Sequence, residues 1–458
     1  MEEKGIITCL EKDTALRCID IAKKAGADAV RVSLSKSIQS AVGILDGKVD
    51  KISYNADCSL FFHIFSSDRY GTFSTNRLDI KDLESFLGNT VKMTRLLSPD
   101  SARTLPKACR KAVDCSQGDE LGLYDESFAQ MTQNSRLGIA RDSAAQNQLL
   151  EMSDSAGLKL VSNECEYSDN LDDNYMVDSD GFEGRHIETS WGFCSEVTIA
   201  AKNCRKYSGY WWDSAPLLKD FNSAGTSAAA FGRAADQVRR TKLKSGKYDI
   251  IVDRVCASRL VAPLLNALDG YSLQQGNSFL SGSLGQCIFP EELDIYDLAR
   301  EKGKYGSRLF DTEGVATAND AIIQGGIVRK YFIDTYIAGK GGFIPTLEGP
   351  SRPKVRCHIC NCDEKEISLE DILARTANGI YITGFNGGNC NAATGNFSFG
   401  IEGFAVRAGE RVGAVNEAVM TGNMISLWKN LFAAADDARE CTRWQIPSLA
   451  FRNIDINI

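Results

Sequence analysis

Hydrophobic and polar positions near the N-terminus follow the periods of a helix and then of strands. Residues 13–26 predict a helix that Asp13 or Thr14 can cap, and its apolar stripe is expected to consist of Leu16, Ile19 and Ala22. Residues 29–35 alternate strictly, so a strand follows whose apolar face is Val30, Val32 and Leu34. The change from one period to the other predicts a helix packed beside a half-buried sheet.

The next segments extend this sheet. Asp46-Gly47 separates two alternating runs and predicts a tight hairpin, because both positions of a primed turn need positive φ. Residues 58–65 and 70–75 predict further strands, and 79–93 a second helix. Residues 1–105 are therefore expected to form an N-terminal α/β domain, an antiparallel sheet with helices on one side.

The rest of the chain predicts a second, β-rich part. Residues 106–240 combine a helix-rich polar stretch, long strands and a helix at 225–243, and we expect them to pack with the N-terminal domain. Residues 241–458 consist mostly of predicted strands, with a hairpin at Gly325-Gly326 and a helix whose Ser368 and Asp371 are spaced as a capping box. The fold class is α+β, with a β-rich C-terminal domain over 241–458.

Composition excludes several classes of protein. The net charge is −8 without a basic stripe, which argues against nucleic-acid binding. No apolar run approaches the roughly 20 residues of a membrane span, and the acidic N-terminus has no apolar signal region. Fifteen cysteines without a repeated spacing fit reduced thiols. We expect a cytoplasmic protein that contacts neither nucleic acid nor membrane.

Metal-binding chemistry has little support in the residues. His63, His186 and His358 are each followed by isoleucine, so an HExxH zinc helix cannot form. His358, Cys360 and Cys362 share one face of an extended segment, but neighbours there stand about 6.6 Å apart. Zinc ligands lie about 2.0–2.3 Å from the ion, so an ordinary strand is favoured over a metal site. An acidic loop at 169–181 lacks the calcium register, and Cys390 has no base near it in the sequence.

One glycine-rich stretch, residues 387–410, suggests a binding surface. From Asn396 onward Phe397, Phe399 and Ile401 point to one face, while Ser398 and Gly400 leave the other face almost bare. A bare face can receive an extended peptide, or another strand of the same chain can fill it. The residues alone leave both alternatives open.

Several segments, in order along the chain, resemble the TldD/PmbA family. They are AKKAGADAVRVSLSKS, LDGKVDKI, DGFEGRHIETSW, GNSFLSGSLGQ, FDTEGVAT and TGNFSFGIEGFAVRAGE. The resemblance implies an N-terminal α/β domain followed by a β-rich C-terminal domain. It also implies one of two branches: a TldD-like zinc protease subunit with an HExxxH helix and a later cysteine, or a TldE/PmbA-like subunit without the histidines.

The resemblance places this chain in the second branch. The positions that match the family's zinc helix are Val261, Ala262 and Asn266, and Cys441 matches the later cysteine. Three zinc ligands and a general base are needed for hydrolysis, so the resemblance implies no catalytic residue, no metal and no cofactor held by this chain.

The implied function is that of the metal-free partner of a TldD-like zinc protease subunit in a heterodimer, and the sequence leaves open whether the isolated chain forms a homodimer. Such a subunit would shape a shared chamber and bind extended or unfolded peptide. The candidate peptide-binding residues are Asn391, Thr394, Gly395, Asn396, Ser398 and Gly400. Two alternatives remain: a stand-alone metallopeptidase using the cluster at 357–362 with Cys441, and a non-enzymatic modulator of DNA gyrase.

Overall fold

A six-stranded antiparallel sheet forms the N-terminal half of the protein. The computed structural model describes residues 4–202, 205–357 and 367–458. The strand order in this N-terminal sheet is β3-β2-β1-β4-β5-β6. Its strands are β1 (Ala29–Leu45), β2 (Lys48–Ser66), β3 (Arg69–Thr75), β4 (Lys159–Asp178), β5 (Glu183–Ala200) and β6 (Lys206–Ala215). Because β1 pairs with β4, strands from both sides of residue 105 share one sheet.

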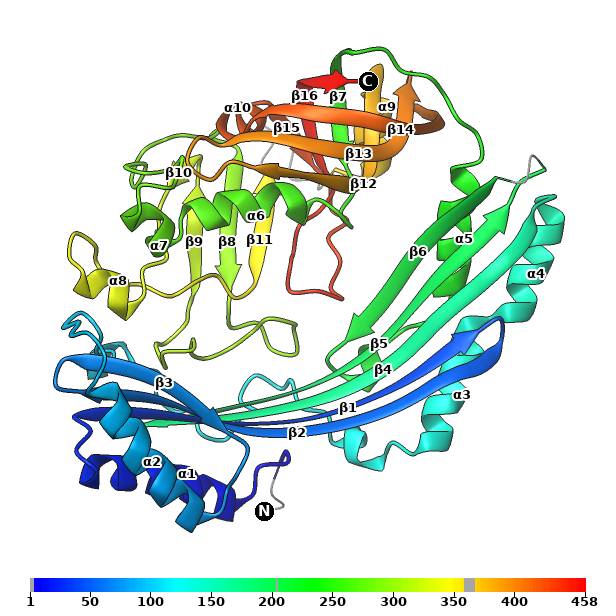
Figure 1. The fold of residues 1–458 in the computed structure, drawn as a ribbon. Coiled ribbons are helices and arrows are strands. Elements are labelled where there is room, and N and C mark those ends of the chain that lie inside the picture. The colour runs from blue at the N-terminus through cyan, green and yellow to red at the C-terminus, as the bar shows by residue number, and fades with distance from the viewer. Residues whose placement is uncertain (1–3, 203–204, 358–366) are drawn as a thin grey trace.

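Five helices cover one face of the N-terminal sheet and leave the other face free of helices (Figure 1). They are α1 (Cys9–Lys24), α2 (Ile80–Thr94), α3 (Gln133–Ala144), α4 (Gln146–Ser155) and α5 (Thr226–Asp236). Val30, Val32 and Leu34 are fully buried beneath α1 and α2, as their alternation predicts. The expected antiparallel sheet with helices on one side is therefore confirmed.

The start and the buried face of α1 differ from the prediction. The helix begins at Cys9, because the Thr8 hydroxyl accepts the Glu11 N–H while the Glu11 carboxylate accepts the Thr8 N–H. Its buried face is Ala15, Cys18 and Ala22, and Leu16 is 43% exposed. Of the predicted stripe, Ala22 is buried and Ile19 packs partly buried against the same core, so the prediction was wrong for Leu16 and missed Ala15 and Cys18.

The hairpin between β1 and β2 turns at Asp46-Gly47, as predicted. Both residues have positive φ, 51° and 77°, the combination that a type I′ turn requires. The two strands pair from this turn back to Ala29 and Phe65, with one irregularity at Gly43/Ile44. This long ribbon and the β4–β5 pair give the sheet its extent and curvature (Figure 1).

The C-terminal half contains two further sheets. The four-stranded sheet has the order β10-β9-β8-β11 and the six-stranded sheet has the order β14-β13-β12-β7-β16-β15. Their strands are β7 (Gly246–Val252), β8 (Leu293–Leu298), β9 (Asn319–Gln324), β10 (Ile327–Val328), β11 (Pro353–Cys357), β12 (Asn378–Cys390), β13 (Asn396–Arg407), β14 (Glu410–Asn423), β15 (Leu431–Ala434) and β16 (Leu449–Asn457). The predicted hairpin at Gly325-Gly326 joins β9 to β10, so the β-rich C-terminal part is confirmed.

Short helices complete this half: α6 (Ser258–Ala267), α7 (Gly270–Gln274), α8 (Thr335–Gly339), α9 (Leu369–Ala374) and α10 (Met424–Lys429). Three 3-10 turns occur elsewhere, at Ala108–Arg110, Glu126–Gln130 and Leu218–Asp220. The predicted capping box begins α9, where Ser368 and Asp371 bond reciprocally. Helix α6 is central, because its Leu264 belongs to one apolar core with Ile295 of the smaller sheet and Ile380 of the larger one. None of the helices in the described ranges is long and apolar enough to cross a membrane.

Contacts at both ends, together with a backbone bridge between Lys111 and Val315, hold the C-terminal half over the helix-free face of the N-terminal sheet (Figure 1). At one end Arg103 stacks on Tyr336, 3.3 Å from the ring centre, and Lys340 Nζ lies 2.9 Å from Asp100. At the other end Arg439 stacks on Trp211 and Trp212 of β6. The two halves therefore meet at both ends, on either side of a hollow.

Candidate functional site

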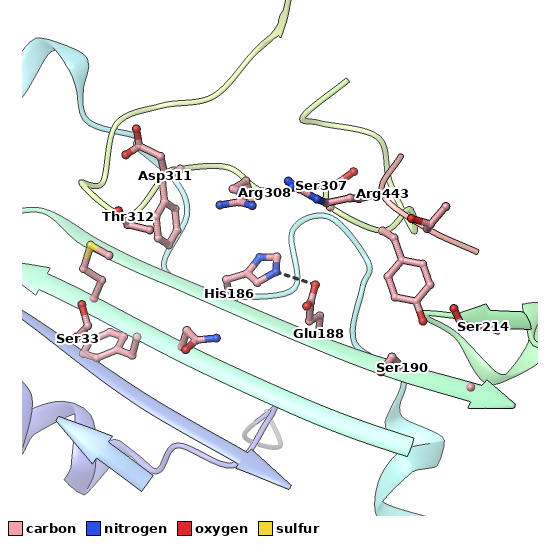
Figure 2. Close-up of a pocket in the computed structure, with 18 of the residues that line it drawn as sticks. Ser33, His186, Glu188, Ser190, Ser214, Ser307, Arg308, Asp311, Thr312 and Arg443 are labelled. Atoms are coloured by element: carbon pink, nitrogen blue, oxygen red, sulfur yellow. Dashed lines mark hydrogen bonds and ion pairs between the residues drawn. The ribbon is translucent and has the colours of Figure 1, made fainter. Parts of the chain in front are cut away.

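A cavity of about 950 Å³ lies between the helix-free face of the N-terminal sheet and two loops of the C-terminal half (Figure 2). We call the loops, residues 305–312 and 441–443, the cavity roof. The polar residues of the cavity floor are Ser33, Asn174, His186, Glu188, Ser190 and Ser214, and Phe61, His63 and Met176 of the same sheet also line the cavity. On β5 the odd residues Ile187 and Trp191 are buried on the helix side, so the even residues face the cavity. The floor is thus the polar half of a strand alternation.

His186 and Glu188 form a hydrogen-bonded pair on the floor. They stand two residues apart on β5, and His186 Nε2 lies 3.2 Å from Glu188 Oε2 (Figure 2). Burial alone would raise the pKa of Glu188, but the hydrogen bond from His186 and the charges of His186 and Arg308 lower it. Burial and the charge of Glu188 raise the pKa of Asp172, which pairs opposite on β4. Glu188 therefore stays ionised and paired at neutral pH.

Asp311 is the carboxylate of the roof, and it organises its own loop. Its Oδ1 accepts the backbone N–H groups of Glu313 and Val315, both at 2.9 Å. Burial and the nearby charge of Glu348 raise the pKa of Asp311 to about 7. This side chain therefore gains and loses its proton near neutral pH.

Cations and a tyrosine make up much of the rest of the roof. Arg443 donates from Nη1 to the carbonyls of Pro350 and Ser351 at 3.2 and 3.3 Å. Burial and the charge of Arg308 lower the pKa of Arg443, so the two guanidinium groups influence each other. Burial raises the pKa of Tyr305, which bonds to Ser214 and Ser190. The roof therefore presents a phenol and positive charge to the polar floor.

The residues at the expected zinc-helix positions do not fit a zinc ion. Val261 is fully buried in the α6 core, Ala262 is half-buried, and Asn266 is exposed. Positions five apart on a helix differ by about 140°, so Val261 and Asn266 point to different surroundings. None of the three side chains is a zinc ligand of the usual nitrogen, thiolate or carboxylate types.

Cys441 lies elsewhere, in the cavity roof, with none of the three α6 positions in the cavity lining. Burial, together with the Asp213 carboxylate, raises the pKa of its thiol. Across residues 4–202, 205–357 and 367–458, no group of three or more His, Cys, Asp or Glu side chains could hold a metal ion. The predicted alternative site at His358, Cys360 and Cys362 lies outside the described residues.

The glycine-rich stretch forms β13 and its preceding turn. Phe397, Phe399 and Ile401 are buried while Ser398 is exposed, which confirms the predicted alternation. However, β13 lies between β12 and β14 and pairs with both. Main-chain addition of a peptide to β13 is therefore not available, because both of its edges are occupied.

The bare positions of β13 are filled by the chain itself. A Cβ at Gly400 would lie 2.2 Å from Asn386 Oδ1 and 3.2 Å from the Asn386 carbonyl oxygen, so β12 occupies the space beside this glycine. Gly395 has φ of 73°, and a Cβ there would lie 3.1 Å from the Phe279 ring. Of the two alternatives left open by the sequence, a neighbouring strand accounts for Gly400.

The polar candidates of this stretch hold the β12–β13 turn. Asn391 Oδ1 accepts the N–H groups of Ala393 and Thr394 at 3.0 Å, and Asn396 Oδ1 accepts from Asn423 at 3.0 Å. Asn391, Thr394 and Asn396 are exposed, and none of the six candidate peptide-binding residues lines the cavity. A contact with peptide here would involve exposed side chains rather than a groove.

Sequence reasoning missed the cavity residues, although two signals were present. His186, Glu188 and Ser190 occur at every second position of a strand whose other positions are largely apolar, which marks one polar face. The segments DGFEGRHIETSW and FDTEGVAT supply His186, Glu188 and Asp311 to the same cavity. Nothing in the sequence indicates that these two segments, more than 100 residues apart, face each other.

Comparisons with known proteins cover both halves of the chain. The family described as PmbA/TldA metallopeptidase C-terminal domain matches residues 245–457. A crystal structure of a candidate modulator of DNA gyrase from Bacteroides thetaiotaomicron is 34% identical, with a TM-score of 0.92 over 99% of this chain and 100% of that one. The metalloprotease PmbA of Escherichia coli O157:H7 is 23% identical over 437 residues, 94% of this chain and 92% of that protein. TldE from Thermococcus kodakarensis shares the fold at 16% identity, with a TM-score of 0.81 over 97% of this chain and 100% of that one.

Proposed function

Because the chain belongs to the TldD/PmbA family, we propose that it is the metal-free, TldE/PmbA-like subunit of a heterodimeric peptidase. In this function it binds extended or unfolded peptide while a TldD-like zinc subunit cleaves the peptide bond. We further propose that the complex acts in the cytoplasm.

The observation that carries the proposal is the composition and burial of α6. Where the zinc branch would place ligands and a base, this chain has a core valine, an alanine and an exposed asparagine. A hydrophobic residue packed in a core cannot be recruited to a metal without disrupting that core. A zinc-dependent reaction in this family would therefore use a site on the partner.

The cavity is the proposed peptide site. Its volume of about 950 Å³ is at the upper end of ordinary ligand pockets, which measure about 300–1,000 Å³. Floor residues such as His186, Glu188 and Ser190 project from β5 at alternate positions, and an extended peptide repeats with the same period of two residues. A polar floor of this spacing can hydrogen-bond a peptide largely independently of its side chains. The exposed turn residues Asn391, Thr394 and Asn396, with Gly395, Ser398 and Gly400, are proposed as a second contact for the same peptide.

The test is reconstitution with a TldD-like subunit from the same organism. We expect the two chains to co-purify as a stoichiometric complex, and cleavage of an unfolded substrate to need both chains and zinc. Elemental analysis should find zinc in the complex and in the partner, but not in this chain alone. The proposal fails if the partner cleaves equally well without this chain, or if this chain alone holds stoichiometric zinc and cleaves peptide. The latter result would support a stand-alone metallopeptidase.

A second candidate follows from the name of the Bacteroides relative, which describes a modulator of DNA gyrase. The net charge of −8 disfavours direct contact with DNA, so this function would require binding to the gyrase protein. Purified gyrase captured by the immobilised chain at physiological salt would support it, and an absence of capture would contradict it.

A further inference from the structure

Arg308 projects from the roof into the cavity, opposite the His186–Glu188 pair (Figure 2). Its backbone is fixed, because its N–H donates to the Ala299 carbonyl and its own carbonyl accepts from the Thr317 hydroxyl. The side chain is half-buried. The protein therefore holds a guanidinium group at the cavity surface on a segment that is tied to the C-terminal half.

This guanidinium has no hydrogen-bonded partner among the described residues, although its charge helps to lower the pKa of Glu188. Among the described residues, no hydrogen bond or ion pair within 4 Å is made by the Arg308 side chain, whereas comparable arginines are paired. Arg185 binds Asp173 through two nitrogens, and Arg352 binds Glu440 and the Tyr305 carbonyl. A guanidinium offers five N–H donors, and those of Arg308 are not taken by another described side chain, so they are open to a ligand. The adjacent Ser307 hydroxyl is also buried without a partner in the described part of the chain.

The acidic groups around the cavity are already engaged. Glu188 is paired with His186 at 3.2 Å. The Oδ1 atom of Asp311 accepts two backbone N–H groups, and its Oδ2 lies 3.4 Å from the Glu348 nitrogen. Arg443 adds a second guanidinium to the same roof. Arg308 and Arg443 therefore place two positive charges beside the Glu188 carboxylate and Asp311, whose pKa is about 7.

Planar guanidinium geometry indicates which anion fits best. Arginine binds a carboxylate through two parallel N–H···O bonds, an arrangement stronger and more directional than a single hydrogen bond. In a cavity with a polar, mostly uncharged floor, one carboxylate would satisfy Arg308 while the rest of the ligand lies along the floor. We propose that Arg308 binds a carboxylate of the peptide held in the cavity, either its C-terminus or an Asp or Glu side chain. This inference rests on the proposed peptide-binding function.

The experiment measures peptide binding by the full-length chain near neutral pH. Four short dansyl-labelled alanine–serine peptides carry either a free C-terminus or a C-terminal amide, and either one central Glu or one central Gln, so the label adds no carboxylate. Fluorescence anisotropy gives the affinity of each peptide. We expect the amide peptide with Gln to bind about 10- to 100-fold more weakly than the peptide that carries the recognised carboxylate. A fall in affinity on amidation identifies the C-terminus as the recognised carboxylate, and a fall on replacing Glu by Gln identifies the side chain.

The variants Arg308→Gln and Arg308→Lys test the residue. Arg308→Gln should remove the preference for the carboxylate and leave the affinity of the amide–Gln peptide almost unchanged. Arg308→Lys keeps the positive charge but cannot form the two parallel N–H···O bonds of a guanidinium, so it should restore only part of the preference. Arg329→Gln removes the same charge at an exposed position outside the cavity. It should change neither the preference for the carboxylate nor the affinity of the amide–Gln peptide. Unchanged thermal unfolding establishes that each variant folds.

The outcomes separate the inference from the function on which it rests. Equal binding of all four peptides by the natural chain, or an equal loss for acid and amide peptides in Arg308→Gln, overturns the carboxylate site and leaves peptide binding intact. If none of the four peptides binds to the chain or to its complex with the zinc subunit, the proposed peptide function fails and the inference with it.

Discussion

The raised pKa of Asp311 leads to a measurable dependence of stability on pH. The carboxyl titrates at about 7 in the folded chain, against an ordinary value of 3.8, and the residue is only 4% exposed. Between these two values the folded state keeps a proton that the unfolded state has lost. Stability from this group is therefore fully present below pH 3.8 and is lost as the pH rises to about 7.

The structure sets the size of this effect. Each pH unit in that window is equivalent to ~1.36 kcal/mol, so about three units give an upper limit of about 4 kcal/mol. Asp311→Asn removes the titration and keeps an oxygen for the N–H groups of Glu313 and Val315. Between pH 5 and pH 8, the natural chain should lose up to about 3 kcal/mol of stability relative to this variant.

Urea unfolding followed by tryptophan fluorescence at pH 5, 6, 7 and 8 measures the difference between the natural chain and Asp311→Asn. Asp82→Asn is the matched control, because the Asp82 side chain on α2 is 52% exposed. The natural chain and the variant share all other groups that titrate in this range, so the difference between their free energies of unfolding removes the contribution of those groups. A constant separation of the two unfolding midpoints from pH 5 to pH 8 would refute the reasoning.

Three further predictions concern other parts of the molecule. A Cβ at Gly388 would lie 1.9 Å from the Ser398 carbonyl, whereas one at Gly387 meets nothing within 4 Å, and both residues have positive φ. Gly388→Ala should therefore lower the melting temperature clearly more than Gly387→Ala, and equal shifts would count against the close approach of β13 to Gly388. Asp173 and Arg185 are buried at 0% and 3% exposure, so Asp173→Asn should cost about 3–5 kcal/mol in urea unfolding, whereas joint replacement by Leu and Met should recover much of the loss. An equal loss in single and double variants would show that the pair is not coupled. Burial raises the pKa of the Cys441 thiol, so mass spectrometry after brief iodoacetamide treatment of the native chain at pH 7 should find this residue unlabelled, and rapid labelling would contradict its placement.

Local structure could be predicted where neighbours in sequence decide it. The alternation of Val30, Val32 and Leu34 was sufficient to assign a strand and its buried face. Asp46-Gly47 was sufficient to assign the turn, because the conformation of a two-residue loop depends mainly on those two residues. The buried face of α1 was not fully predictable in this way, because Ala15 and Cys18 face the sheet where small side chains let the helix lie close to it.

Long-range pairing explains why the site was missed. A period of two indicates which face a strand buries, but it does not identify the neighbouring strand. The bare face of β13 was visible in the sequence, yet the occupation of its edges by β12 and β14 was not. The cavity depends even more on distant contacts, because Ser33, His186, Arg308 and Cys441 come from four separate regions of the chain.

The division of the cavity between a floor and a roof has a consequence for variation and for protein engineering. The floor belongs to strands whose opposite faces form the apolar core under the helices, so its positions can change only within the limits of a continuous sheet. Residues 305–312 belong to a connection between strands, and such segments tolerate changes of length and composition. New ligand preferences could therefore be introduced by grafting this loop from a relative, with the sheet retained as a constant platform.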